Sequence, residues 1–148
     1  MKIRLISFLF LFNLVCFSSY GQFSRNANGV TIECPFANVG DTGVVDGVTY
    51  TAVDRSSLIT KIAAGQASEC CTSLVTDMNG LFASNATNPD IRSWDTSSVT
   101  STALMFMNAT NFNQDLSKWN IGKVQSTMGM FQGATNFNNG EAPGASTN

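Results

Sequence analysis

Histidine is absent from the 148 residues of this chain, and only 12% of the residues are charged. Without histidine, the Ser-His and Cys-His nucleophile systems are excluded, together with the commonest general base and transition-metal ligand. We therefore predict that the protein is not an enzyme and holds no metal or other cofactor. Asn, Thr, Ser and Gly are plentiful instead, which predicts a neutral, polar surface with many hydrogen-bonding groups.

The first residues have the order of features found in a secretory signal peptide. Lys2 and Arg4 precede an apolar run over residues 5–17, and small residues follow up to Gly21. A membrane anchor is the alternative, but a run of about 13 residues is shorter than the roughly 20 that a bilayer core requires. We predict that residues 1–21 are removed and that the mature protein is secreted or cell-surface, with no membrane span.

Basic residues are also scarce. Without Lys2 and Arg4 the chain keeps 6 basic and 10 acidic residues, a formal net charge of −4 spread thinly over its length. Proteins that bind nucleic acid concentrate positive charge on one face, so nucleic acid is not an expected partner.

The pentapeptide ATNFN occurs twice, beginning at Ala109 and again 25 residues later at Ala134. Apolar residues around it recur at the same distance, namely Trp94 and Trp119, Val99 and Val124, Met105 and Met130, and Phe106 and Phe131. An internal period in the twenties is typical of proteins built from stacked repeats. The sequence therefore predicts coils over residues 67–87, 91–112 and 116–138.

Each predicted coil has two halves. The apolar spacing of residues 116–121 is L-x-x-L-x-L, the strand pattern of leucine-rich repeats. The second half has apolar residues spaced for one helical stripe, or for a looser 3₁₀-like turn, at Val124, Met128, Phe131 and Ala134. One such unit cannot bury its own apolar face, so neighbouring coils are expected to stack. The predicted fold is α/β, a short leucine-rich-repeat-like solenoid of about three coils.

Three segments resemble a known family of repeats. They are FNQDLSKWN at residues 112–120, V-x-x-x-x-x-M-F at residues 124–131 and GATNFN at residues 133–138. Over residues 72–138 the chain is similar to the bacterial surface-protein repeats called BspA-like, also described as the DUF285 family, which are atypical leucine-rich repeats. The resemblance implies a bacterial surface protein, and adhesion for some members of the family.

Residues 22–66 are predicted to form a separate N-terminal module. Residues 44–51 alternate as the arms of a hairpin with Asp-Gly at its turn. Asp54 is placed to cap a helix over residues 55–64. A stack of coils needs its first coil covered by a unit with a polar outer face, and this small hairpin-plus-helix module suits that role.

The predicted organisation follows from these segments. It consists of a signal peptide at residues 1–21, an N-terminal cap module at residues 22–66, BspA-like leucine-rich repeats at residues 67–138 and a polar tail at residues 139–148. The tail resembles an interrupted further repeat, so we expect the sequence to be a piece of a longer surface protein.

Removal of the signal peptide leaves three cysteines, Cys34, Cys70 and Cys71. Secretion permits disulfides, and with an odd number one thiol is left over or pairs between chains. The coil alignment gives Cys70 the inward position that Trp94 has in the next coil, so we predict a Cys34–Cys70 bond. Cys71 is then expected to face outward and to allow a dimer. The residues alone do not decide whether Cys70 or Cys71 pairs with Cys34.

The outward positions of the predicted strands form the candidate binding surface. These positions are Arg92, Ser93, Asp95, Ser117, Lys118 and Asn120. Stacked-repeat proteins commonly bind partners on such an open sheet face, although a mixed polar face is also ordinary for a solvated sheet. We predict a non-catalytic, adhesion-type module that binds an extracellular protein or glycan. The alternative is a structural spacer of a larger surface protein, with no ligand of its own.

Overall fold

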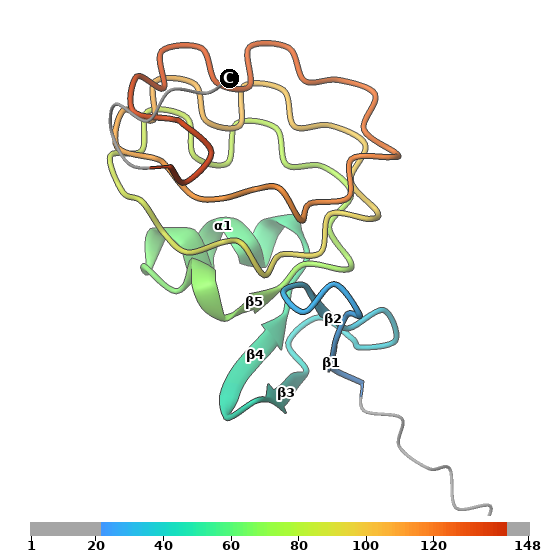
Figure 1. Cartoon of the computed structure of the whole chain (residues 1–148). Helices are drawn as coiled ribbons and strands as arrows, with labels where there is room; N and C mark the ends of the chain where they lie inside the picture. The colour runs from blue at the N-terminus through green and yellow to red at the C-terminus, as the bar shows by residue number, and fades with distance from the viewer. Residues whose placement is uncertain (1–21, 142–148) are drawn as a thin grey trace, which may run out of the picture.

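The computed structural model describes residues 22–141, which form two small sheets, one short α-helix and a series of long loops (Figure 1). The signal peptide predicted at residues 1–21 lies outside the described residues, as does most of the tail predicted at residues 139–148. Within the described range, no helix has the length and apolar character needed to cross a membrane.

The N-terminal module begins with a two-stranded antiparallel sheet of β1 (Ser24–Arg25) and β2 (Ile32–Glu33). The Asn28 side chain orders the loop between them, because its Oδ1 accepts hydrogen bonds from the N–H groups of Val30 and Thr31, both at 2.9 Å. Asn commonly stabilises turns in this way. The loop therefore presents a fixed backbone to the residues around it.

A β-hairpin follows, in which β3 (Thr42–Val45) pairs antiparallel with β4 (Val48–Ala52). Its two turn residues, Asp46 and Gly47, have φ angles of 51° and 81°. Positive φ at both positions is what the favoured two-residue hairpin turn requires. The hairpin predicted from the Asp-Gly pair is confirmed.

Helix α1 (Arg55–Ala63) is capped by Asp54 as predicted. Asp54 Oδ1 accepts from the Ser57 N–H at 2.8 Å, and the Ser57 hydroxyl accepts from the Asp54 N–H at 3.0 Å. This reciprocal arrangement satisfies backbone donors that the first turn of a helix leaves without partners. Gly65, with a φ of 73°, follows the end of the helix. Leu58 packs in the larger of two hydrophobic clusters, which we call the main core and which also contains Trp94, Phe106 and Phe112.

Strand β5 (Cys70–Cys71) pairs parallel with β4, which gives the strand order β3-β4-β5. Cys71 forms a disulfide with Cys34, and Cys70 is a buried free thiol. The predicted Cys34–Cys70 bond is therefore wrong, and Cys71 is not the outward thiol that the predicted dimer required. Successive side chains of a strand point to opposite faces. Cys70 does enter the main core, but Cys34 lies on the other face, in a smaller core with Cys71.

The buried thiol has little tendency to ionise. The Cys70 Sγ donates a hydrogen bond to the Gln66 carbonyl at 3.4 Å. Burial raises the pKa of Cys70 to about 11, while the nearby Lys61 ammonium lowers it to a smaller extent. Removing the charged form from water is what disfavours the thiolate.

The predicted α/β leucine-rich-repeat-like solenoid is wrong. The described residues hold two small sheets, the α-helix α1 and a short 3₁₀ helix, η1 (Ala67–Glu69). After β5 they contain turns, loops and isolated bridges in place of strands and helices. Residues 91–96 and 116–121, predicted as strands, each contain a tight turn. In each, a tryptophan N–H donates to the carbonyl three residues earlier, at 3.1 Å for Trp94 and 3.0 Å for Trp119.

Residues with positive φ explain why residues 124–134 do not form the helix predicted for the second half of the coil. Gly129 and Gly133 have φ angles of 61° and 73°. Glycine adopts this conformation without strain, and it is unfavourable inside a helix. The N–H groups of Met130 and Gln132 each donate to the carbonyl three residues earlier, so the segment is a chain of single turns.

Residues 72–90, 91–115 and 116–141 lie one above another, and we call them layers 1, 2 and 3 (Figure 1). Every second N–H group along part of one layer donates to a carbonyl of the next layer at 2.7 to 3.0 Å. Met128 of layer 3, which was predicted to be in the core, is 70% exposed. The helical spacing that placed it inside does not apply to a chain of turns.

Aromatic rings of successive layers stack in the main core. Phe82, Phe106 and Phe131 form one column, with adjacent ring centroids 5.5 and 5.4 Å apart. Trp94 and Trp119 form a second, with centroids 6.4 Å apart and planes inclined by 3°. Burial of these large side chains removes apolar area from water and so stabilises the fold.

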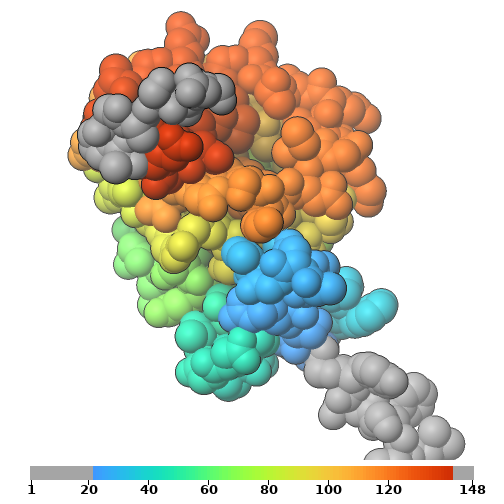
Figure 2. Space-filling view, viewed as in Figure 1, coloured from blue at the N-terminus to red at the C-terminus, as the bar shows by residue number. Residues whose placement is uncertain are grey.

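The N-terminal module packs against the layers (Figure 2). The Ile32 N–H of β2 donates to the Ser93 carbonyl of layer 2 at 2.8 Å. On α1, the Arg55 guanidinium donates to the carbonyls of Asp77 and Asn79 at 2.9 and 2.7 Å. The β1–β2 sheet and the helix are thus tied to the layers.

Replacing Cys34 and Cys71 together by serine is expected to lower the free energy of unfolding. The bond spans a sequence separation of 37, and closing a loop of that length in the unfolded chain is worth about 4 kcal/mol. Urea unfolding followed by tryptophan fluorescence measures this difference.

The single variants Cys70→Ser and Cys71→Ser serve as controls for the assignment. Cys70→Ser should keep the disulfide in a non-reducing mass measurement, and Cys71→Ser should lose it. The reverse pattern would contradict the pairing described above.

Candidate functional site

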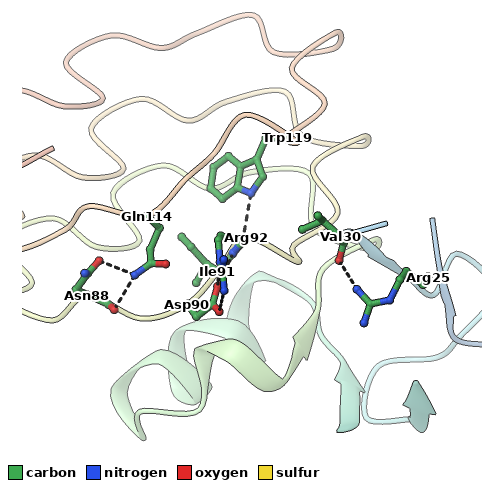
Figure 3. Close-up of polar contacts among 8 residues, drawn as sticks. All are labelled: Arg25, Val30, Asn88, Asp90, Ile91, Arg92, Gln114 and Trp119. Carbon is green, nitrogen blue, oxygen red and sulfur yellow. Dashed lines mark hydrogen bonds and ion pairs between the residues drawn. The ribbon is translucent and has the colours of Figure 1, made fainter. Parts of the chain in front are cut away.

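An open groove of about 460 Å³ lies where the N-terminal module meets layers 1 and 2. Its walls come from the β1–β2 region, from β4, from the 3₁₀ helix η1 (Ala67–Glu69) and from the junction of the first two layers. The side chains that give the groove its chemistry are Arg25, Val30, Tyr50, Glu69, Asp90 and Arg92. Several of them appear in Figure 3.

Arg25 is fixed at the groove by three acceptors. Its Nε donates to Asp46 Oδ2 at 2.7 Å, and its Nη1 donates to the Gly29 carbonyl at 3.2 Å. The same Nη1 donates to the Val30 carbonyl at 3.1 Å (Figure 3). The tight β1–β2 loop supplies those carbonyls, and the hairpin turn supplies the carboxylate. Three bonds to one guanidinium restrict its rotamers before any ligand is present.

Arg92 is held by a neighbour two residues away. Its Nε and Nη2 donate to the two carboxylate oxygens of Asp90 at 2.8 and 2.6 Å. The side-chain hydrogen bond from Arg92 is the main cause that lowers the pKa of Asp90, against the opposing effect of burial. The same bond raises the pKa of Arg92. Both side chains stay about half exposed, so the pair faces the open groove.

Bonds between layers hold the segment that carries this pair. Gln114 Nε2 donates to the carbonyl and to the Oδ1 of Asn88 at 3.2 and 3.0 Å (Figure 3). The indole Nε1 of Trp119 donates to the Ile91 carbonyl at 3.3 Å. The backbone on both sides of Asp90 is therefore anchored to later parts of the chain.

The side chains that line the groove carry equal numbers of positive and negative charges, and Asp46, which pairs with Arg25, lies outside this lining. Arg25 and Arg92 contribute two positive charges, and Glu69 and Asp90 contribute two negative charges. Within the described part of the chain, no group of three or more His, Cys, Asp or Glu side chains is placed to hold a metal ion. The arrangement offers fixed donors and acceptors beside the apolar side chain of Val30, which suits recognition of polar, uncharged groups.

The residues predicted for binding do not lie together on one surface. Arg92 and Ser93 line the groove. Ser117, Lys118 and Asn120 are exposed in layer 3, but outside this groove. The open sheet expected to carry them does not form, because the segments are turns.

Asp95 is buried, with 5% of its surface exposed, and so does not face solvent as predicted. Its Oδ2 accepts from the Ser73 hydroxyl at 2.6 Å, and the Ser73 oxygen accepts from the Cys34 N–H at 2.9 Å. Asp95 Oδ1 also accepts from the Ser97 N–H at 2.9 Å. This chain of bonds connects layer 2 to the disulfide region, so Asp95 stabilises the fold.

Sequence reasoning missed Arg25, Tyr50 and Glu69. They lie in different elements, and none belongs to the recurring pattern that directed attention to residues 91–96 and 116–121. Their proximity depends on how the N-terminal module docks on the layers. A local pattern in the sequence carries no signal of that kind.

The geometry defines a small, disulfide-bonded, loop-rich protein with a layered aromatic core and a polar groove at the module junction. The chain belongs to the family described as Mycoplasma protein of unknown function, DUF285, whose sequence pattern matches residues 54–142. The match covers α1 and the three layers and confirms the DUF285 resemblance noted in the sequence. No curated protein and no solved structure matches the chain.

Replacing Arg92 by glutamine is expected to raise the pKa of Asp90 toward its ordinary value, because the bond from Arg92 is the main cause of the lowering. At a pH above about 3.9, the ordinary carboxyl pKa, the pair stabilises the folded protein. This contribution to stability is lost as the pH falls through the lowered pKa that Asp90 has in the folded protein. A carboxyl-carbon NMR titration measures the shift. Arg25→Gln is the control, and an equal shift in that variant would contradict the assignment.

Replacing Asp95 by alanine is expected to destabilise the protein by about 2 kcal/mol, the typical cost of removing a buried hydrogen-bonded charge. Asn120→Ala is the matched control at the corresponding exposed position, where Asn120 Oδ1 accepts only from the Gly122 N–H among residues 22–141. Thermal and urea unfolding of both variants give the comparison. Equal stability of the two variants would show that Asp95 does not connect the parts as described.

Proposed function

We propose that the protein is a secreted or cell-surface binding module, related to BspA-like surface proteins, that binds a protein or glycan without catalysis. Its ligand occupies the groove. The observation that supports this proposal is that Arg25 and Arg92 are both fixed in place, and each keeps one nitrogen for a ligand. Among residues 22–141, Nη2 of Arg25 and Nη1 of Arg92 have no hydrogen-bond partner.

A preorganised site of this kind loses little side-chain entropy on binding. Its charges are balanced, so a strongly charged ligand gains no net attraction from Arg25, Arg92, Glu69 and Asp90 together. Hydroxyl and amide groups can both donate to the carboxylates and accept from the guanidinium nitrogens. The favoured ligand is therefore a polar, uncharged surface of a glycan or protein.

The Cys34–Cys71 disulfide supports the extracellular location. Disulfides persist in oxidising compartments and are rare in the cytosol. The neutral polar composition, with 12% charged residues, is in keeping with an exposed binding surface. The resemblance to BspA-like repeats supports adhesion as the biological setting.

The test is a binding screen with the full chain on immobilised glycans and purified extracellular-matrix proteins, followed by Arg92→Glu and Lys118→Glu. Both replace an exposed cation by glutamate, but only Arg92 lines the groove. For any probe that binds, Arg92→Glu should weaken affinity roughly tenfold, about 1.4 kcal/mol, and Lys118→Glu should change it little. Unchanged melting temperatures control for folding.

Two outcomes contradict the proposal. One is the absence of binding to any probe, which is the result expected of a structural spacer. The other is an equal loss of affinity in the two variants, which would place the ligand elsewhere or reduce the interaction to net charge.

A further inference from the structure

The outer side of layer 3, which we call the terminal face, forms a mainly apolar hollow. It encloses about 300 Å³ and is lined mainly by Leu116, Trp119, Ile121, Val124, Phe131 and Phe137. Ile121 remains 66% exposed there. This face is separate from the groove proposed above, since the two share no lining residue.

Backbone donors on this face form a row without acceptors. In layer 1 the donors to the next layer are Met78, Gly80, Phe82 and Ser84, and in layer 2 they are Thr102, Leu104, Phe106 and Asn108. The carbonyls that accept these bonds belong to every second residue of the next layer. The corresponding N–H groups of layer 3 belong to Thr127, Gly129, Phe131 and Gly133, and they have no hydrogen-bond partner within residues 22–141. Unpaired donors of this kind are a template for an added chain segment.

A buried hydroxyl also lacks a partner here. Thr102 lines the hollow and is 2% exposed, and among the described residues its Oγ1 has no hydrogen-bond partner. A buried polar group without a partner is rare in folded proteins. The unpaired hydroxyl marks a polar position in the wall of an otherwise mainly apolar hollow.

The aromatic columns end at the same face. Phe131 stacks on Phe106, and Phe137 stacks on Phe112 at a centroid distance of 5.9 Å. Inside the molecule every such ring is covered by the next layer, whereas the outer sides of Phe131 and Trp119 line the hollow. An occupant that places an aromatic or aliphatic side chain on them continues the contact already made between layers.

The opposite end of the stack argues against a second copy as the occupant. There the Arg55 guanidinium of α1 already donates to the carbonyls of Asp77 and Asn79, so a head-to-tail contact would find two carbonyls of the layer 1 row already occupied. Two terminal faces meeting about a two-fold axis would place donors against donors. The complementary occupant has carbonyls at alternate residues, as an extended chain has.

We propose that the terminal face binds an extended, apolar segment of a different polypeptide. The partner supplies carbonyl groups to the four N–H groups of layer 3 and places an aromatic or aliphatic side chain against Trp119 and Phe131. Such addition of a strand to an open row of donors is a common mode of peptide recognition, with affinity from the main chain and specificity from the pockets.

The probe is a synthetic peptide with the sequence of residues 124–138. In the protein, carbonyls of this segment already accept the donors of layer 2, at Ser126, Met128, Met130 and Gln132. A scrambled peptide of the same composition is the control. The readout is backbone amide exchange by NMR on the full chain.

Without peptide, the amides of Thr127, Gly129, Phe131 and Gly133 should exchange rapidly, and those of Thr102, Leu104, Phe106 and Asn108 slowly. Saturating peptide should slow the first set at least about tenfold, as expected for new hydrogen bonds, and leave the second set unchanged. Ile121→Glu should weaken peptide binding by roughly tenfold or more. Val44→Glu is the matched control, since Val44 is 67% exposed and lies on β3, away from the face.

Several results would overturn the proposal. Equal protection by the scrambled peptide, or equal binding to Ile121→Glu and Val44→Glu, would show that no specific segment docks. Concentration-dependent self-association abolished by Ile121→Glu would assign the face to a second copy. Protection of the four amides without peptide, lost when residues 142–148 are deleted, would assign it to the chain's own end.

Discussion

The backbone hydrogen bonds between layers are the interaction on which the rest of the molecule depends. They require every second N–H to point out of its own layer, and left-handed residues make this possible. Gly80, Leu104 and Gly129 occupy corresponding places and have φ angles of 65°, 56° and 61°. Each closes a tight turn that uses one N–H internally and leaves the next for the neighbouring layer. The aromatic columns follow, because the register of these bonds sets one ring above another.

The N-terminal module could be predicted because its signals are local. An Asp-Gly turn and the cap at Asp54 act within a few residues, and both elements form as expected. The layers could not be predicted, because the spacing of their apolar residues was interpreted as strands and helices. Leu104 has a positive φ although it is not a glycine, and nothing in its identity reveals this conformation. The recurrence of Trp94 and Trp119 does mark rings that stack.

The groove was only partly visible in the sequence for a related reason. Arg92 and Ser93 were found because they sit beside a recurring tryptophan, and Asp95 was placed with them on a sheet that does not form. In the structure, Asp95 turns inward to Ser73 and connects layer 2 with the disulfide. Arg25 joins the site from far away in the chain. The burial of Asp95 and the position of Arg25 both depend on how distant segments pack together. Local patterns in the sequence do not predict such packing.

The position of Cys70 next to Cys71 has a kinetic consequence. During oxidation both thiols compete for Cys34, and exchange between the two pairings requires attack by a thiolate. In the folded protein, burial holds the pKa of Cys70 at about 11, so at pH 7 only about one molecule in ten thousand carries that thiolate. Folding therefore slows the exchange of the Cys34–Cys71 bond with the adjacent thiol. Once formed, the native pairing is protected by the burial of Cys70.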